Sequence, residues 1–121
     1  MEYLTKLFKA LSDPTRLRIM YLLITARSEI CICEIMDALG IPQYNISKHM
    51  KELKHAGVVK ERKEGRFVFY SLLECCDGFS QKIFEAVKAV ESKKLCEDLK
   101  RLKKRLPRRT CKSCSGEAVK C

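Results

Sequence analysis

The stretch from Gly40 to Gly57, with the sequence GIPQYNISKHMKELKHAG, constrains the fold of this chain more than any other. At about 100° per residue, its apolar side chains Ile46, Met50 and Leu53 fall in one narrow stripe. The opposite side is polar and mostly cationic, and it carries Tyr44, Ser47, Lys48, Lys51 and His55. Such a helix requires a core on one side and a negatively charged, hydrogen-bonding partner on the other. The stretch therefore predicts a DNA recognition helix.

The residues around this stretch carry the signals that start and stop helices. Gly40 can close a preceding helix in a left-handed conformation, Pro42 suits a first helical position, and Gly57 ends the segment. Residues 29–39, EICICEIMDAL, repeat apolar side chains at spacings of three and four, and they predict a helix that starts at Glu29. Two short helices joined by a tight turn predict a helix-turn-helix.

Two further helices are predicted before this unit, and a hairpin after it. Residues 2–11 carry apolar side chains at helical spacing, and Asp13 and Pro14 can cap and begin a second helix that runs to about Ala26. Residues 58–63 and 67–72 are β-branched or aromatic runs that predict a hairpin. Three basic residues lie at or near its tip, namely Arg62, Lys63 and Arg66. A basic hairpin after a recognition helix predicts a wing that reaches DNA phosphates.

The C-terminal part of the chain predicts one long helix over residues 77–106, with a five-residue step in its apolar seam between Val90 and Leu95. At 1.5 Å per residue this helix would be about 45 Å long, longer than one small winged domain can cover. The excess apolar stripe predicts a homodimer through the terminal helices. The fold class is thus mainly α with a β-hairpin wing, a winged helix-turn-helix domain over residues 1–106. A flexible, basic, cysteine-rich tail is predicted over residues 107–121.

The charge distribution points to a nucleic-acid partner. Of the formal net charge of +10, residues 93–121 contribute +8, from 11 Lys and Arg against 3 Asp and Glu. Residues 48–66 hold 7 basic residues against 3 acidic ones. Basic regions of this kind bind phosphates with release of counterions, although the tail can equally be a solvated surface. Double-stranded DNA is the predicted partner.

The chain is predicted to be cytoplasmic, with no membrane segment. No run approaches the roughly 18 apolar residues of a membrane span, and the N-terminus lacks the pattern of a signal peptide. The chain has 8 cysteines. In a cytosolic protein such thiols favour metal ligation or redox sensing over a disulfide scaffold.

Several motifs together are similar to the ArsR/SmtB family of metal-sensing repressors. They are SDPTRLRIMYLL, EICICEI, ISKHMKELKHAGVV and RKEGRFVFYSL, and the resemblance covers roughly residues 3–105. It implies a homodimeric winged helix-turn-helix that represses an operator and releases it when a metal or metalloid binds. It also implies base contacts from the recognition helix and backbone contacts from the wing. The predicted DNA-binding residues are Gln43, Tyr44, Ser47, Lys48, Lys51, Arg62, Lys63 and Arg66.

The inducer site is predicted from the same resemblance. The arsenite-responsive branch of the family resembles ELCVCDLC, and this chain keeps Cys31 and Cys33 but has Met36 at the third position. On an ideal helix, residues two apart differ by about 200°, so the two cysteines would chelate one ion only if the first turn were distorted. That distortion would move the DNA-reading helix, and ligand binding would then lower DNA affinity.

The identity of a third ligand stays open in the sequence. Arsenite and antimonite prefer three thiolates, and a thioether is a weak substitute. The possible additional ligands are Cys75, Cys76, Cys111, Cys114 and Cys121. Cys96 is predicted to be a buried apolar residue beside the long-helix seam. That helix contains no histidine, which argues against a zinc or cadmium site on it. No cofactor is expected to be required for DNA binding itself.

Two alternatives accompany this hypothesis. The first is a repressor of the same fold that responds to thiol oxidation or persulfide formation. The second is a protein for trafficking or storage of soft metals, in which the cysteine-rich tail is the functional part. An enzyme is not predicted, because both histidines lie in the recognition helix and the chain has no nucleotide-binding loop.

Overall fold

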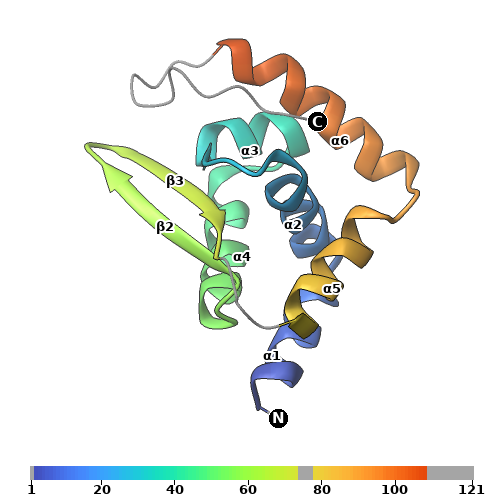
Figure 1. Cartoon of the computed structure of the whole chain (residues 1–121). Helices are drawn as coiled ribbons and strands as arrows, with labels where there is room; N and C mark the ends of the chain where they lie inside the picture. The colour runs from blue at the N-terminus through green and yellow to red at the C-terminus, as the bar shows by residue number, and fades with distance from the viewer. Residues whose placement is uncertain (1, 74–77, 109–121) are drawn as a thin grey trace.

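The structure is a computed structural model that describes residues 2–73 and 78–108 of the chain (Figure 1). It begins with α1 (Glu2–Leu11) and α2 (Pro14–Ala26), as the sequence predicts. Asp13 caps the second helix, because its Oδ2 accepts a hydrogen bond from the Arg16 backbone N–H at 3.1 Å. Pro14 follows at the first helical position, where its missing N–H costs nothing.

The helix-turn-helix consists of α3 (Ile32–Leu39) and α4 (Gln43–His55). Gly40 closes α3 with φ of 68°, a left-handed conformation that favours glycine, and its N–H donates to the Met36 carbonyl at 2.8 Å. Pro42 is the residue before α4, with an extended ψ of 154°, so its predicted place inside the helix is wrong by one position. The predicted apolar stripe of α4 is confirmed, since Ile46, Met50 and Leu53 are all fully buried.

A three-stranded antiparallel sheet contains β1 (Ile30–Cys31), β2 (Val59–Glu64) and β3 (Phe67–Leu72), in the order β1-β3-β2. The strands β2 and β3 form the predicted wing, which projects on one side of the molecule while α5 and α6 lie on the other (Figure 1). The strand β1 was not predicted, and the prediction of a helix from Glu29 is wrong. Ile30 and Cys31 are instead extended, because they pair with Tyr70 and Phe69 on the inner edge of β3.

The predicted long helix over residues 77–106 is also wrong, because the structure has two helices there. They are α5 (Gly78–Lys88) and α6 (Lys93–Arg105), and a 3-10 turn (Leu106–Arg108) follows. The five-residue step in the seam marks the break. Ser92 starts α6 by accepting the Leu95 N–H at 3.4 Å.

The helix α6 folds back onto α3 and α2 of its own chain (Figure 1). Leu95, Leu102 and Leu106 are therefore buried without a second subunit. The sequence argument that this excess apolar stripe requires a dimer partner does not hold for α6. Apolar side chains remain exposed elsewhere, on α1 and α5 and just after α5, where Phe8 is 52% exposed, Phe79 38% and Val90 45%.

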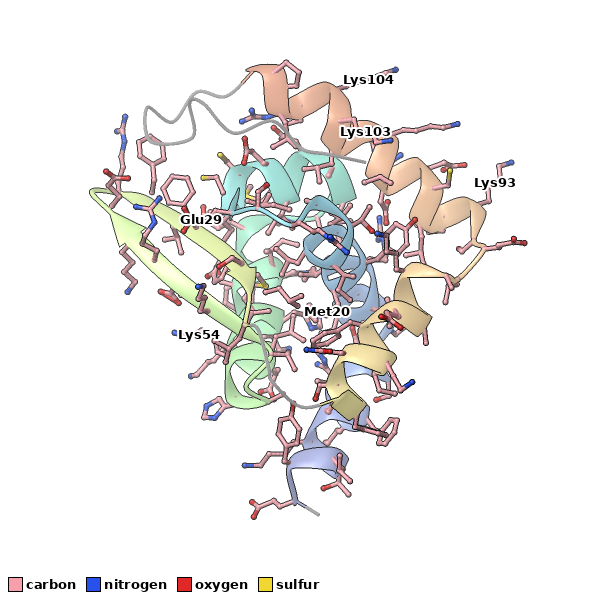
Figure 2. The ribbon with its side chains drawn as sticks, in the orientation of Figure 1. Met20, Glu29, Lys54, Lys93, Lys103 and Lys104 are labelled. Atoms are coloured by element: carbon pink, nitrogen blue, oxygen red, sulfur yellow. The ribbon has the colours of Figure 1, made fainter. Side chains whose placement is uncertain are left out.

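The core lies between α2, the helix-turn-helix and the sheet. Its largest fully buried side chains are Leu7, Ile19, Met20, Leu22, Leu23, Ile30, Ile35, Ile46, Met50, Leu53, Phe69 and Leu102. Met20, labelled in Figure 2, lies at the centre of the helices. In the described residues, no helix has both the length and the hydropathy of a membrane span. The core thus holds α4 and the wing in a fixed position relative to each other, and their polar faces point outwards.

Candidate functional site

The outer face of α4 presents the side chains predicted to read DNA. Gln43, Tyr44, Lys48 and Lys51 are exposed, and Tyr44 is exposed to 79%. Ser47 is half-buried at the edge of this face. A fully buried stripe on the inner side of the same helix leaves the polar side chains no orientation except outwards. These residues form one continuous polar surface, called here the reading face.

A salt bridge ties α4 to the wing. Lys54, labelled in Figure 2, lies in the last turn of α4. Its Nζ is 2.8 Å from Oε2 of Glu61 on β2. The hydrogen bond from Lys54 lowers the pKa of Glu61 below its ordinary value. This pair was missed in the sequence, where two opposite charges seven residues apart across a turn give no distinctive signal.

The three basic residues of the wing are in different surroundings. Lys63 is exposed, with its Nζ 3.6 Å from Glu61, and Arg66 is exposed at the tip with its guanidinium 5.7 Å from the Phe67 ring centre. Arg62 is engaged more fully by neighbouring groups. A phosphate can reach Lys63 and Arg66 more directly than Arg62.

Arg62 forms a two-pronged salt bridge with Glu29, from Nε to Oε2 at 2.8 Å and from Nη2 to Oε1 at 2.9 Å. Its Nη1 also donates to Glu64 Oε2 at 3.0 Å, and the guanidinium covers the Phe69 ring at 4.5 Å. These contacts raise the pKa of Arg62 and lower that of Glu29. Glu29, labelled beside the hairpin in Figure 2, therefore links the residues before Cys31 to the wing.

Cys31 and Cys33 form a close pair of sulfur atoms, with 3.1 Å between the two Sγ atoms. The expectation that they point to opposite sides of one helix is wrong, because Cys31 precedes α3 with extended backbone angles and only Cys33 is helical. Glu34 Oε1 holds this start by accepting the Cys31 N–H at 2.9 Å. Cys31 is fully buried and Cys33 is half-buried. The two sulfurs are therefore close enough together for one ligand atom to bind both.

Arg105, from the last turn of α6, lies against this sulfur pair. Its Nη2 donates to Cys33 Sγ at 3.6 Å, and its Nε donates to Asp37 Oδ2 at 2.6 Å. Burial raises the pKa of Cys33 to about 11, Cys31 adds to the increase, and the positive charge of Arg105 opposes it. The contact between Arg105 and Cys33 was not predicted. The two residues are 72 positions apart, and no local pattern in the sequence indicates that their helices pack together.

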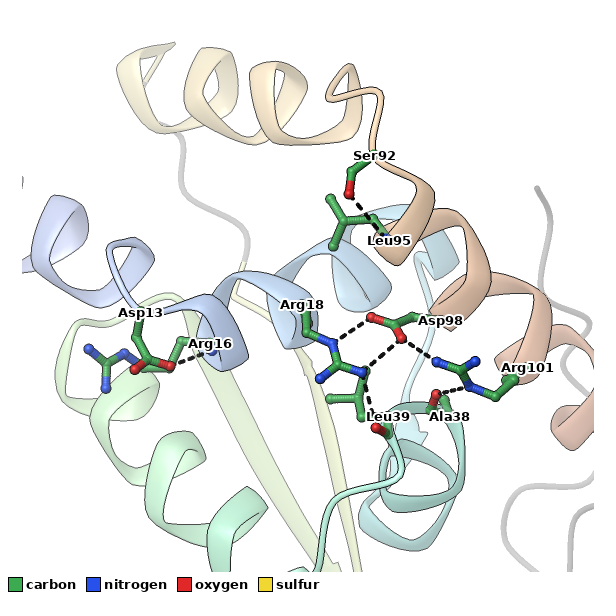
Figure 3. A network of polar contacts seen from close by, with 9 residues as sticks. All are labelled: Asp13, Arg16, Arg18, Ala38, Leu39, Ser92, Leu95, Asp98 and Arg101. Carbon is green, nitrogen blue, oxygen red and sulfur yellow. Dashed lines mark hydrogen bonds and ion pairs between the residues drawn. The ribbon is translucent and has the colours of Figure 1, made fainter.

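A second polar cluster fastens the other end of α3 to α6, as Figure 3 shows. Asp98 is fully buried and accepts hydrogen bonds from Arg18 at 2.8 and 2.9 Å and from Arg101 at 2.6 Å. The two arginines also donate to the last carbonyl groups of α3, Arg101 to Ala38 at 2.6 Å and Arg18 to Leu39 at 3.0 Å. Called here the Asp98 cluster, it holds the turn that leads into α4.

Among the residues that the structure describes, no third predicted ligand joins the sulfur pair. Met36 packs against the hydrophobic core. Within residues 2–73 and 78–108, no group of three or more His, Cys, Asp and Glu residues is arranged to hold a metal ion. Cys96 is exposed, so the prediction that it is buried is wrong. Cys75, Cys76, Cys111, Cys114 and Cys121 lie outside the described residues, as does most of the predicted tail over 107–121.

Comparisons with known proteins find relatives of this chain among transcription regulators. Residues 13–61 match the family described as bacterial regulatory protein, arsR family. The chain is 41% identical over 90 residues to an uncharacterized HTH-type transcriptional regulator of Methanocaldococcus jannaschii, covering 74% of this chain and 93% of that protein. It is 32% identical over 113 residues to the arsenical resistance operon repressor of Escherichia coli K12, covering 93% and 90% of the two chains.

A solved structure is similar as well. HlyU from Vibrio cholerae N16961 superimposes with a TM-score of 0.61 at 28% identity, over 71% of this chain and 88% of that one. The observed arrangement of helices and wing is therefore shared with an independently determined structure.

Proposed function

Because the chain belongs to the ArsR family of bacterial transcription regulators, we propose that it is a repressor that binds operator DNA as a homodimer and is released by a thiophilic inducer. Arsenite or antimonite, bound by Cys31 and Cys33, is the proposed inducer, and other soft metal ions are the alternatives. The observation that carries the proposal is the 3.1 Å separation of the two sulfurs. The similarity to the arsenical resistance operon repressor of Escherichia coli supports the same inducer class.

The position of Cys31 supports a route by which an inducer would weaken DNA binding. Cys31 pairs with Phe69 on the wing strand β3, and it is also the residue from which α3 starts. At its other end, α3 leads through Gly40 into α4. A ligand that shifts Cys31 therefore acts on the wing and on the reading face together. By linkage, an inducer that binds the DNA-free form more tightly must lower DNA affinity by the same factor.

The reading face supports a prediction about DNA specificity. Replacing Lys48 or Arg66 by alanine is expected to weaken binding to all DNA sequences and to reduce the salt dependence by about one phosphate contact. Gln43→Ala is expected to change base preference, because a glutamine side chain can pair with a base edge. Fluorescence anisotropy with operator and scrambled duplexes at several salt concentrations measures both effects.

The matched control for the DNA experiment is Lys93→Ala, which removes a charge of the same sign from α6 (Figure 2). It is expected to bind like the wild type. Wild-type binding by all three reading-face and wing variants would show that DNA docks elsewhere.

The proposed dimer interface is the exposed apolar surface formed by α1 and α5. Phe8 and Phe79 meet edge to face there, with 5.8 Å between ring centres, and both remain exposed to solvent. Exposed aromatic pairs favour association, and a two-fold dimer places two recognition helices about one DNA turn apart.

Phe79→Lys is expected to convert the protein to a monomer and to weaken operator binding, because the charge would be buried at the interface. Analytical ultracentrifugation measures the change in mass. Leu73→Lys is the control, since Leu73 is exposed to a similar extent, 37%. An unchanged dimer in the Phe79 variant would place the interface elsewhere.

The close sulfur pair also favours a second candidate, a repressor of the same fold that is released by thiol oxidation. Hydrogen peroxide could oxidise the two thiols to a disulfide, with loss of both S–H bonds, formation of one S–S bond and release of two water molecules. Operator binding titrated in parallel with arsenite, cadmium and hydrogen peroxide distinguishes the signals. A protein without operator-specific binding in any arm would fit the soft-metal trafficking or storage alternative.

A further inference from the structure

We propose that Arg105 is a specificity-determining residue of the thiol site. Its guanidinium recognises the hydroxyl group that stays on arsenic(III) after two thiols have bound the arsenic. The inference rests on the proposed function of Cys31 and Cys33 as inducer ligands. It assigns to α6 a direct part in a site whose sulfur atoms come from the start of α3.

The geometry places a fixed hydrogen-bond donor beside the sulfurs. Arg105 Nη2 donates to Cys33 Sγ at 3.6 Å, and the arginine side chain is only 14% exposed. Asp37 Oδ2 accepts from Nε of the same guanidinium at 2.6 Å and so sets its orientation. A guanidinium is planar, always charged and rich in donors, which suits it to bind an oxygen atom carrying partial negative charge.

The chemistry of a two-thiol site supplies such an oxygen. Arsenous acid, As(OH)3, reacts with two thiols to form two As–S bonds, while two As–OH bonds and two S–H bonds break and two water molecules leave. No electron is transferred, and one hydroxyl group remains on arsenic. No third thiol is placed beside this pair in the described part of the chain. The hydroxyl oxygen therefore needs a hydrogen-bond partner at the site.

Arg105 meets that need by exchanging one acceptor for another. The hydrogen bond that now ends on Cys33 Sγ is redirected to the arsenic-bound oxygen, which is a better acceptor than sulfur. Because both arsenic and its hydroxyl are held at Cys33, the required movement is small. A hydrogen bond from a charged donor strengthens binding, whereas an arginine contributes nothing as a metal ligand because it has no lone pair to donate.

Phenylarsine oxide is the probe that separates this effect from thiol binding itself. It reacts with two thiols to give two As–S bonds and one water molecule, and its third position is a phenyl carbon. The bound product carries no hydroxyl group. A residue that recognises the hydroxyl must affect arsenite and leave phenylarsine oxide unaffected.

The test compares wild type and Arg105→Met, which keeps a long side chain but removes every donor. Binding of arsenite and of phenylarsine oxide to the reduced full-length protein is measured by isothermal titration calorimetry and by the ultraviolet absorption of the sulfur–arsenic bonds. Arsenite affinity is expected to fall about tenfold or more, while phenylarsine oxide affinity stays unchanged. Lys104→Met, at an exposed position on the same helix, is the control.

A second variant guards against misfolding of the first. Asp37→Asn changes a side chain that is 59% exposed and leaves Arg105 present but less firmly oriented. It is expected to weaken arsenite binding by a smaller factor, again without effect on phenylarsine oxide. Equal losses for both probes, or no loss for either, in the two variants would overturn the role of Arg105. Wild-type protein that binds neither probe would overturn the proposed function as well.

Discussion

Replacing Cys31 and Cys33 together by serine is expected to abolish release from operator DNA by arsenite while operator affinity stays at the wild-type level. Hydroxyl groups are poor ligands for soft metals and metalloids, so the double variant loses the inducer. The fold is expected to tolerate the change, because serine is a favoured residue at the helix start that Cys31 occupies. Fluorescence anisotropy of a labelled operator, titrated with arsenite, measures both properties in one experiment.

Cys96→Ser is the matched control, because this cysteine is exposed on α6 and lies apart from the sulfur pair. It is expected to respond to arsenite like the wild type. If the double variant still dissociates at the wild-type dose, the inducer binds elsewhere. Deletion of residues 108–121, which removes three further cysteines, then tests the tail as that site.

Asp98→Ala is expected to lower the free energy of unfolding by about 3 kcal/mol, since breaking a buried ion pair leaves its partner charge uncompensated. Asp98 is fully buried and accepts hydrogen bonds from two arginines, of which Arg18 has a side chain only 15% exposed. The same arginines bind the final carbonyl groups of α3, so the loss also loosens the turn before α4. Urea unfolding followed by circular dichroism measures the free energy.

The control for this prediction is Glu97→Ala, which removes the neighbouring carboxylate of α6 and the same formal charge. Glu97 is only half-buried, so the change in stability is expected to be much smaller than for the fully buried Asp98. If Asp98→Ala proves as mild as Glu97→Ala, the Asp98 cluster does not hold α6 to the helix-turn-helix. Operator affinity of both variants, measured at low temperature where both are folded, reports whether the loosened turn affects DNA binding.

The parts of the fold that are predictable from sequence are those with local signals. The stripe of Ile46, Met50 and Leu53 has helical spacing, and all three side chains are fully buried in α4. The change from helical spacing to β-branched and aromatic runs after Gly57 predicts the hairpin that β2 and β3 form. Neighbouring residues determine these elements, so one sequence is enough.

The parts that were missed depend on partners that are distant in the sequence. Ile30 and Cys31 fit a helical pattern, and only the free edge of β3, about 40 residues later, draws them into a strand. Arg105 reaches Cys33 only because the chain turns between α5 and α6. Asp98 did leave a signal, since it lies three residues after Leu95 and four before Leu102, on the apolar seam. Its burial was predictable, but its pairing with Arg18, 80 positions away, was not.

The pairing of β1 with β3 couples the position of Cys31 to the position of the wing tip. Cys31 is registered opposite Phe69, and Arg66 at the tip lies three residues further along the hairpin. At about 3.3 Å per residue, the tip is roughly 10 Å from the pair of Cys31 and Phe69. A small tilt of β1 is therefore expected to move the tip of the wing further than it moves α4, which the core holds at Ile46, Met50 and Leu53. We expect the wing to lose its contacts with the outer flank of the operator before α4 loses its contacts with the central bases.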